Sequence, residues 1–383
     1  MTKNDQFSYR VLLFADFVTQ YKESMPNARL FELTLPWLAA TEEFMLPENS
    51  QVIVHCLYQS VEDQEPILNV AWPLVHSTKK KSSQNKISSL SSFYSSVSEP
   101  IFFSPPSKGI LHQLLSYIVQ EHQWLSMQLG AFEGGMVEKT LVEHFHYQRV
   151  FSKTDNVYQV GIADYAEYYQ QRPSQLRNTI KRREKKLVKA HKYRIEIITD
   201  ISDFSDAFIT YKAIYQQSWK GDEFSFDFIE QVCLAALAEN KLRLGLLYVD
   251  DEPAAAQLWF LQSNLQPDFR LDNDENVTKE HCGHLQITAS IFKLAYTPQY
   301  QQYSVGSLLS LALSEHVISK DKVTSIEFGM GSEPYKKDWL SENRTRQVYQ
   351  VFNPSGIYGK LAIIRKIVLP RLVKLLSRKV SKK

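Results

Sequence analysis

The residues Ser304-Val305-Gly306-Ser307 have the types and the spacing that could bind a phosphate group. They open a helical pattern with apolar residues at i, i+3, i+4 and i+8, namely Leu309, Ala312, Leu313 and Val317. The first turn of a helix carries unpartnered backbone N–H groups and partial positive charge, and both favour an anion. Gly306 would leave room for the ligand, and Ser304 or Ser307 could cap the helix. The same residues also suit an ordinary capped helix, because they match neither a P-loop nor a dinucleotide fingerprint.

Two predicted strands flank this helix. An apolar run from Ile291 to Tyr296 precedes the turn, and a second apolar run from Ser325 to Phe328 follows the helix. Gly329 and Gly331 then break the pattern. The predicted order is therefore strand, glycine-containing turn, helix and strand.

This stretch shares a larger set of residues with a known family. The shared residues are Lys293 to Tyr296, Ser304 to Leu309, Glu327, Gly331, Glu333, Tyr335, Lys336 and Trp339. With them the chain resembles the C-terminal domain of GNAT-type acetyltransferases of the CelD/BcsL kind, which belong with the FemAB-like proteins. Val305 stands where the family usually has proline, and Ser332 stands where it usually has the first aspartate. The resemblance is clearest from about residue 168 to residue 360 and is fainter in the N-terminal half.

The resemblance implies an acyl-CoA co-substrate, such as acetyl-CoA, and no metal. Its pyrophosphate would lie on the turn and helix start formed by Ser304, Val305, Gly306, Ser307 and Leu308. The preceding strand, with Lys293, Leu294, Ala295 and Tyr296, would pair with the pantetheine arm and supply a backbone N–H to the thioester carbonyl. Lys293 could touch phosphate or only neutralise a carboxylate.

Five further residues are candidates for acid–base chemistry or acceptor binding. Glu327 could act as a base or could be a hydrogen-bonded structural carboxylate. Tyr335 could protonate the leaving thiolate, as the resemblance implies, or could be a packing residue. Glu333 and Lys336 could position an acceptor or pair with each other at i, i+3, and Trp339 belongs to the same motif.

Length and composition favour a two-domain globular protein. The chain has 383 residues, of which 44% are hydrophobic and 12% aromatic. Cys56, Cys233 and Cys282 are scattered and odd in number, which fits a reducing compartment. The N-terminus has no signal-peptide pattern, and no apolar run is long enough to span a membrane. We therefore expect a cytoplasmic protein.

Charge is distributed unevenly along the chain. The segment from Arg172 to Arg194 holds ten Lys/Arg and one acidic residue, and Ile357 to Lys383 holds nine Lys/Arg and none. With a net charge of +2 overall, the rest of the chain carries −16. Such asymmetry points to an anionic partner, namely a CoA phosphate, RNA or an anionic membrane, or to solvated helix faces.

The chain as a whole reads as mixed α/β, and the resemblance implies two tandem GNAT-like domains, the first of them degenerate. We expect an N-terminal domain at residues 1–163, a C-terminal GNAT acetyltransferase domain at 164–356 with a basic linker helix at 164–192, and a basic helix or tail at 357–383. In the N-terminal half, the sequence pattern predicts short strands at Tyr147–Phe151 and Val157–Gly161. In the C-terminal domain, Phe204 to Trp219 forms a helix whose apolar stripe, including Trp219, is expected in the core.

The C-terminal helix presents Leu361, Ile364, Val368, Leu372 and Leu375 on one side, and Pro370 could kink it. It could lie on an anionic membrane, but Arg365 and Lys379 fall inside the apolar sector, so packing on the body is favoured. A metal site at His281-Cys282-Gly283-His284 is set aside because the spacing is not that of a zinc site.

The resemblance implies an enzyme that transfers an acyl group from acyl-CoA to an amine, on a small molecule or on a sugar or other envelope or exopolysaccharide precursor. One alternative is a FemAB-like aminoacyl transferase that uses aminoacyl-tRNA, with RNA phosphates on Arg172–Arg194. Another is a non-catalytic binding protein on a GNAT scaffold, because fold does not decide function.

Overall fold

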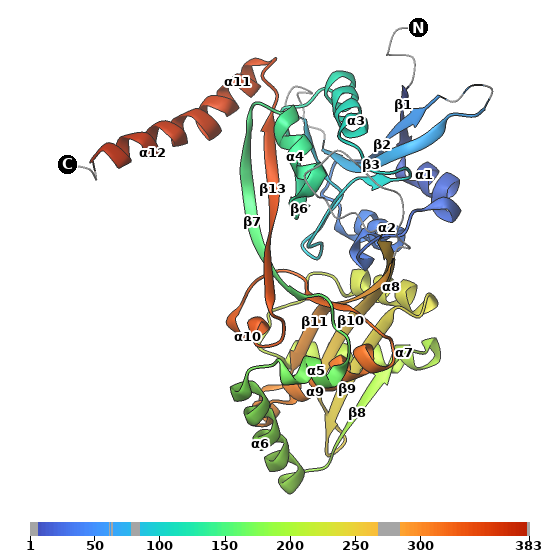
Figure 1. Cartoon of the computed structure of the whole chain (residues 1–383), viewed down its shortest axis with the longest axis vertical. Helices are drawn as coiled ribbons and strands as arrows, with labels where there is room; N and C mark the ends of the chain where they lie inside the picture. The colour runs from blue at the N-terminus through green and yellow to red at the C-terminus, as the bar shows by residue number, and fades with distance from the viewer. Residues whose placement is uncertain (1–6, 61, 63, 78–84, 267–283, 381–383) are drawn as a thin grey trace. The chain divides into compact units, whose positions relative to one another are not determined.

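The computed structural model describes residues 7–60, 62, 64–77, 85–266 and 284–380, and its elements fall into two compact units (Figure 1). Unit 1 consists of Met1–Pro26, Thr41–Thr154 and Thr345–Lys383, and unit 2 of Asn27–Ala40 and Asp155–Arg344. The units are thus built from separated segments, unlike the contiguous domains expected at 1–163, 164–356 and 357–383. The reason is that strand pairing brings residues after 345 into the sheet of unit 1.

In unit 1 the strand order is β1-β2-β3-β4-β6-β13, with β5 beside β3, and neighbours are antiparallel except for β4 and β6. The strands are β1 (Phe7–Leu13), β2 (Ser50–Gln59), β3 (Ile67–Ser77), β4 (Lys86–Ser89), β5 (Ile101–Phe102), β6 (Ser126–Phe132) and β13 (Glu342–Phe352). The helices include α1 (Phe14–Tyr21), α3 (Lys108–Glu121) and α4 (Gly135–His144). Helix α3 forms because its apolar residues recur at helical spacing, and that face packs into the core through Leu111, Leu114, Leu115 and Ile118.

In unit 2 the strand order is β7-β12-β11-β10-β9-β8, and only β11 and β12 are parallel neighbours. The strands are β7 (Gln148–Gln159, shared with unit 1), β8 (Tyr193–Ile198), β9 (Leu242–Val249), β10 (Glu252–Gln266), β11 (His284–Tyr296) and β12 (Ser325–Phe328). The helices include α2 (Leu35–Met45, shared with unit 1), α5 (Tyr165–Gln170), α6 (Ser174–Ala190), α7 (Phe204–Gln217), α8 (Phe226–Ala238), α9 (Val305–Ser319) and α10 (Pro334–Lys337), and a 3-10 turn, η5, spans Pro298–Tyr303.

The alternation of side chains along β10 separates two layers of helices. Trp259 belongs to the core that includes α9 residues, whereas the next residue, Phe260, lies with Trp37 against the α8 side. Helix α9 approaches β9 closely at Gly245, where a Cβ would lie 2.8 Å from Leu313 Cδ1. The sheet of unit 2 is therefore covered on both faces, which confirms the expected α/β class.

Three predicted features differ in the structure. The two short strands expected at Tyr147–Phe151 and Val157–Gly161 are one continuous strand, β7, because the polar residues between them stay extended. Trp219, which we expected in the core, is 54% exposed because α7 ends at Gln217, two residues before it. Cys282 and the His281-Cys282-Gly283 part of the metal candidate lie outside the described residues.

The C-terminal segment is helical but packs through residues other than those predicted. It comprises α11 (Ile357–Ile363), a π-helical turn at Ile364–Val368 and α12 (Leu369–Val380), shown in red in Figure 1. Ile363 and Ile367 pack with Phe352, whereas the predicted packing residues Leu361, Ile364, Val368 and Leu372 are exposed. The π turn ends two residues before Pro370, whose missing N–H and bulky ring disturb the preceding helical turn.

Candidate functional site

The parallel pair β11/β12 in unit 2 opens into a splay. Pairing runs from Thr288 with Ser325 to Ile291 with Phe328. Strand β12 ends at Phe328, whereas β11 continues to Tyr296. The chain turns away after Phe328 because Gly331 takes φ +90° and its N–H donates to Asp155 O of β7 at 2.7 Å. The outer backbone edge of the last residues of β11 therefore faces the opening.

A β-bulge lies at the mouth of this opening. On the β10 side, Leu258 pairs with Lys293 and Trp259 pairs with Ile291, which leaves Phe292 as an extra residue. The bulge follows directly after the last residue of β11 that pairs with β12. A bulge re-aims the backbone groups around it, so an N–H can point into the opening instead of into the sheet.

The start of α9 presents backbone donors. Ser304 is in the left-handed conformation, with φ +56°, and its carbonyl accepts the N–H groups of Ser307 and Leu308 at 2.9 and 3.0 Å. The N–H groups of Val305 and Gly306 have no acceptor among the residues that the structure describes. Ser304 occupies the N-cap position. We predicted that Ser304 or Ser307 could cap the helix, but no side chain makes a capping hydrogen bond. Instead Ser304 Oγ accepts a hydrogen bond from Arg183 Nη1 of α6.

Gly306 is required by protein packing, not by open space for a ligand. A Cβ at this position would lie 3.0 Å from Tyr296 Cδ1. The Gly306 carbonyl accepts a hydrogen bond from the buried Gln257 Nε2 at 2.9 Å, and Trp259 Nε1 donates to Gln257 Oε1 at 2.9 Å. Gln257 thus fixes the first turn of α9 to β10. A glutamine inside an otherwise apolar strand was the sequence signal for this role, and we had not selected it.

The basic linker helix α6 contributes positive charge to the same turn. Besides Arg183, Lys186 Nζ donates to Gln302 Oε1 at 3.3 Å and lies 5.6 Å from the centre of the Tyr303 ring. An open pocket of about 480 Å³ adjoins the turn, lined by Arg183, Pro298, Gln299, Gln301 and Gln302. The unpaired N–H groups of Val305 and Gly306, the N-terminus of α9 and the Arg183 guanidinium together form a site suited to phosphate. We call this site the phosphate candidate.

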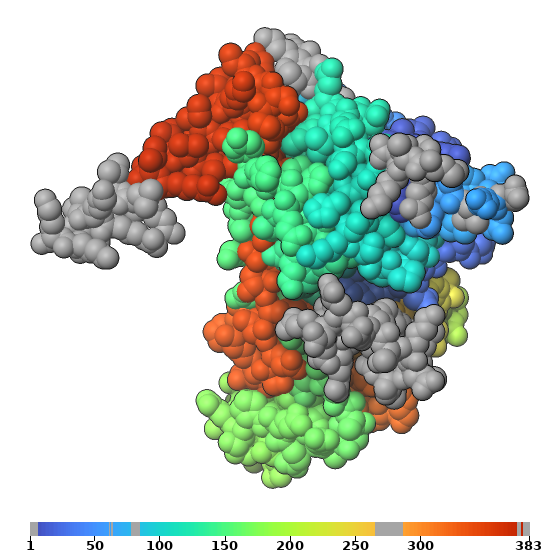
Figure 2. Space-filling view, turned by 45° about the horizontal axis from the view of Figure 1, so that its top comes forward, coloured from blue at the N-terminus to red at the C-terminus, as the bar shows by residue number. Residues whose placement is uncertain are grey.

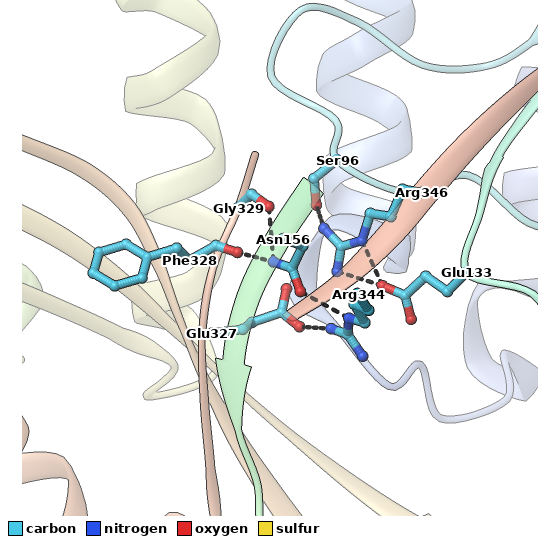
Figure 3. Close-up of polar contacts among 8 residues, drawn as sticks. All are labelled: Ser96, Glu133, Asn156, Glu327, Phe328, Gly329, Arg344 and Arg346. Carbon is cyan, nitrogen blue, oxygen red and sulfur yellow. Dashed lines mark hydrogen bonds and ion pairs between the residues drawn. The ribbon is translucent and has the colours of Figure 1, made fainter. Parts of the chain in front are cut away.

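Glu327 is held in a buried polar network in unit 2 (Figure 3). Arg344 Nη2 pairs with the Glu327 carboxylate, and Arg344 Nε donates to Asn156 Oδ1 at 2.7 Å. Asn156 Nδ2 in turn donates to the carbonyls of Phe328 and Gly329. This geometry favours the structural carboxylate over the base, because the Glu327 carboxylate is committed to Arg344, which Asn156 holds in turn. The residues that hold it were not foreseen from the sequence.

A comparable network lies within unit 1, where the buried Arg346 bonds to Glu133 and Ser96 (Figure 3). A buried guanidinium is tolerated only when such partners compensate its lost hydration. The network therefore stabilises the N-terminal end of β13 in unit 1, and it has no counterpart among the residues that we selected from sequence.

The residues after β12 pair among themselves. Glu333 Oε2 and Lys336 Nζ are 2.7 Å apart at i, i+3, and the buried Lys336 also donates to the carbonyls of Met330 and Gly331. Burial, the largest single effect, raises the pKa of Glu333, but the hydrogen bond from Lys336, a backbone hydrogen bond and the charges of Lys336 and Lys220 together lower it below its ordinary value. Trp339 is 6% exposed and belongs to the core, so the structure does not bring it to the opening.

Tyr335 lies in α10, beyond the end of β12, and is 44% exposed. Its ring is 6.0 Å from that of Phe328 in an edge-on arrangement. Burial, with a smaller effect of Glu333, raises the pKa of Tyr335 to about 12. The phenol is therefore protonated at neutral pH and can donate a hydrogen bond or a proton.

Lys293 does not face the phosphate candidate. Its Nζ forms a buried ion pair with Glu223 Oε2 at 2.7 Å, on the loop between α7 and α8. This arrangement matches the alternative in which Lys293 neutralises a carboxylate. Burial lowers the pKa of Lys293, although Glu223 opposes the effect.

Lys220 is a titratable residue that sequence analysis missed. Its Nζ lies 5.6 Å from the centre of the Tyr215 ring, and the neighbouring Trp219 stacks on Tyr296 with ring centres 4.3 Å apart. Burial and the charge of Lys293 lower the pKa of Lys220 to about 8, with Glu223 opposing. Lys336 and Glu333 act on the same group, the first lowering and the second raising the pKa. We call Lys220, Lys293 and Lys336, with Glu223 and Glu333, the lysine centre. The sequence feature that could have identified Lys220 is the charged and aromatic stretch from Trp219 to Glu223, which lies between two helices rich in apolar residues.

Two kinds of feature are absent from the part of the chain that the structure describes. Among the described residues, no group of three or more His, Cys, Asp or Glu side chains is placed to hold a metal ion. Within the same residues, no helix combines the length and the apolarity needed to cross a bilayer.

Residues 174–265 and 284–337 match the family model described as "Acetyltransferase (GNAT) domain". This part of the chain is a GNAT-type acyltransferase domain. It contains the splay, the α9 start and the lysine centre, and the expectation of an acyltransferase is confirmed. No curated protein sequence matches the chain.

Among solved structures, FemX is similar over 93% of this chain and 100% of its own, with a TM-score of 0.57 and 10% identity. At this identity the likeness shows the fold, and the tandem GNAT-like architecture is thereby supported. A tandem GNAT protein from the clavulanic acid biosynthesis pathway gives a TM-score of 0.46 at 10% identity, over 92% of this chain and 100% of that chain. The C-terminal domain of a putative lysylphosphatidylglycerol synthetase from Agrobacterium fabrum gives 0.49 at 11% identity, over 93% and 97%.

Proposed function

We propose that unit 2 transfers an acyl group from acyl-CoA to an amine. The observation that carries the proposal is that the splayed edge of β11, the bulge at Phe292 and the unpaired N–H groups of Val305 and Gly306 follow one another along the chain. These are the groups that a long thioester with a pyrophosphate would require, in the order in which it would require them. The GNAT match covers this same stretch.

In this proposal the N–H groups of Val305 and Gly306 hold the pyrophosphate, with Arg183 beside them. The outer edge of β11 from Phe292 to Tyr296 pairs with the pantetheine amides, as an added strand would. A backbone N–H at the bulge donates to the thioester carbonyl. When bound, acyl-CoA supplies the electrophilic carbonyl that the amine attacks.

Lys220 is the group that we assign to accept the proton of the attacking amine. A general base works best when its pKa lies near the working pH, and the pKa of Lys220 is about 8. As the C–N bond forms and the C–S bond breaks, one proton passes from the amine nitrogen to Lys220 Nζ. Tyr335 Oη–H is assigned to the departing sulfur. Glu327, Glu333, Lys336 and Trp339 keep the structural roles that their contacts favour.

The acceptor in this proposal is an amine on a small molecule or on a saccharide or envelope precursor, as the resemblance to the CelD/BcsL kind suggests. We place the reaction in the cytoplasm, because Cys56 and Cys233 are free and buried thiols. Anionic membrane surfaces are a second class of partner, which the basic C-terminal helix would bind.

The direct test is the melting temperature of the purified chain with acetyl-CoA, longer acyl-CoAs and free CoA. A ligand that binds only the native state raises stability by about 2.7 kcal/mol at 100 Kd. We expect an increase with every CoA species, because the phosphates are common to all of them. If no CoA species shifts the melting temperature at millimolar concentration, the proposal is wrong.

An aminoacyl transferase that uses aminoacyl-tRNA is the second candidate. The observation in its favour is the set of exposed cations on α6 that contact nothing at the phosphate site, namely Lys181, Arg182, Lys185 and Lys189. Binding of tRNA that weakens steeply with added salt, and that is lost when these four residues become glutamine, would favour it. Retained CoA binding with no tRNA binding would exclude it.

A further inference from the structure

The C-terminal helical segment has one face that packs on unit 1 and another that is apolar and exposed. Ile363 and Ile367, four residues apart, pack with Phe352. The exposed apolar residues are Ile357, Leu361, Ile364, Val368, Leu369, Leu372 and Val373, each between 40% and 71% exposed. Most of them recur at intervals of three or four residues and so form a stripe along the helix.

Basic residues accompany this apolar stripe. Lys360, Arg365, Lys366 and Arg371 are exposed, and residues 357–383 contain nine Lys/Arg and no Asp or Glu. Along the sequence, Lys or Arg occurs in almost every turn of the helix. Figure 2 shows this segment at the surface of the molecule (red).

The basic residues distinguish between the possible binding partners of this exposed apolar face. A second copy of the chain would bring the same cations together, and the repulsion would oppose pairing. Nucleic acid would use the cations but would leave the apolar stripe in water. A membrane with anionic lipids satisfies both, because acyl chains take up the apolar side chains while the head groups neutralise the cations.

We propose that the segment from Ile357 to Val380 binds the surface of an anionic membrane and lies parallel to it. Arg365 falls inside the apolar sector, but this does not oppose membrane binding, because long Lys and Arg side chains reach the head groups while their carbon stems cover apolar surface. The packing of Ile363 and Ile367 on Phe352 keeps the helix attached to unit 1, so the chain would be held at the membrane through this segment. The proposal is independent of the acyl-CoA reaction.

The test is co-sedimentation of the full chain with vesicles of phosphatidylcholine, with and without about 30% phosphatidylglycerol. We expect binding to the anionic vesicles, weaker binding at 0.5 M salt, and little binding to pure phosphatidylcholine. The double variant Val368→Glu/Leu372→Glu should lower the partition coefficient on the order of 100-fold. The matched control is Ile201→Glu/Ile209→Glu, which changes two exposed apolar residues of unit 2 and should bind as the wild type does.

The contribution of charge is tested separately. Arg365→Gln/Lys366→Gln/Arg371→Gln should also lower partitioning on the order of 100-fold, since each cation near an anionic surface contributes about fivefold. Its control, Lys181→Gln/Lys185→Gln/Lys189→Gln on α6, should leave partitioning unchanged. An unchanged circular dichroism spectrum and melting temperature show that each variant is folded. No binding of the wild type, equal binding to both vesicle types, or equal loss in the controls would overturn the proposal.

Discussion

Gly306 lies directly against the ring of Tyr296, and a Cβ at this position would be 3.0 Å from Tyr296 Cδ1. The relationship joins the end of β11 to the first turn of α9, the two elements that our proposal assigns to the pantetheine arm and to the pyrophosphate. Gly306→Ala should therefore destabilise the protein by about 1 kcal/mol, as an overpacked contact does. Urea denaturation measures the effect.

The same substitution has the opposite expectation when the ring is removed. In a Tyr296→Ala background, Gly306→Ala should stabilise by about 0.5 kcal/mol, because alanine restricts the unfolded chain and favours the helix. An equal effect in both backgrounds would show that the ring is not what requires a glycine.

Arg183 and Arg182 are adjacent on α6 and provide a matched pair for ligand binding. Arg183 contacts Ser304 at the phosphate candidate, whereas Arg182 is exposed. Arg183→Ala should weaken the affinity for free CoA by about 10-fold, since a charge-assisted hydrogen bond to phosphate contributes roughly 1.5 kcal/mol or more. Arg182→Ala should change it by less than about twofold. Isothermal titration measures both, and equal losses would point to general electrostatics instead of a built site.

Glu327 offers a test of structural support against base catalysis. Arg344→Met leaves the buried Glu327 carboxylate without its cation and should destabilise the protein by about 3 kcal/mol. Glu327→Gln should also destabilise the protein. It should leave the rate of acyl transfer within about 10-fold of wild type, because Lys220 accepts the proton in our proposal. A loss of about 1000-fold in kcat, with stability unchanged, would return the role of base to Glu327.

The lowered pKa of Lys220 predicts a specific dependence of stability on pH. Its pKa is about 8 in the folded protein, against an ordinary value of 10.5, so the unfolded chain binds this proton more tightly. Between these two pH values the unfolded state carries more of this proton, and the free energy of unfolding rises with pH from this group alone. Lys220→Met should remove that rise.

The measurement is the difference in urea midpoint between wild type and Lys220→Met from pH 7 to pH 10. The control is Lys185→Met, an exposed lysine on α6, which should give a difference independent of pH. If the difference in urea midpoint between wild type and Lys220→Met is constant across this range, Lys220 titrates normally and is not the base.

Local features of the site could be predicted from sequence because they depend on neighbouring residues. The run from Ile291 to Tyr296, the turn at Ser304 and the helix after it follow from apolar spacing, and β11, η5 and α9 occupy these positions. The pairing of Glu333 with Lys336 was one of two alternatives, and helical spacing brings them together. In the C-terminal helix the same reasoning chose the wrong packing side, because periodicity identifies a stripe but not the surface that covers it.

The sequence by itself determined the order of strands and helices, the glycine positions and the two basic segments, since each is a property of consecutive residues. Only the tertiary structure decided which distant side chains meet. Arg183 reaches Ser304 across 121 positions, and Glu223 neutralises Lys293 across 70. Such contacts depend on how the sheet and its helices pack. The pKa of Lys220 likewise depends on burial and on charges brought near by folding, and no local pattern of residues contains that information.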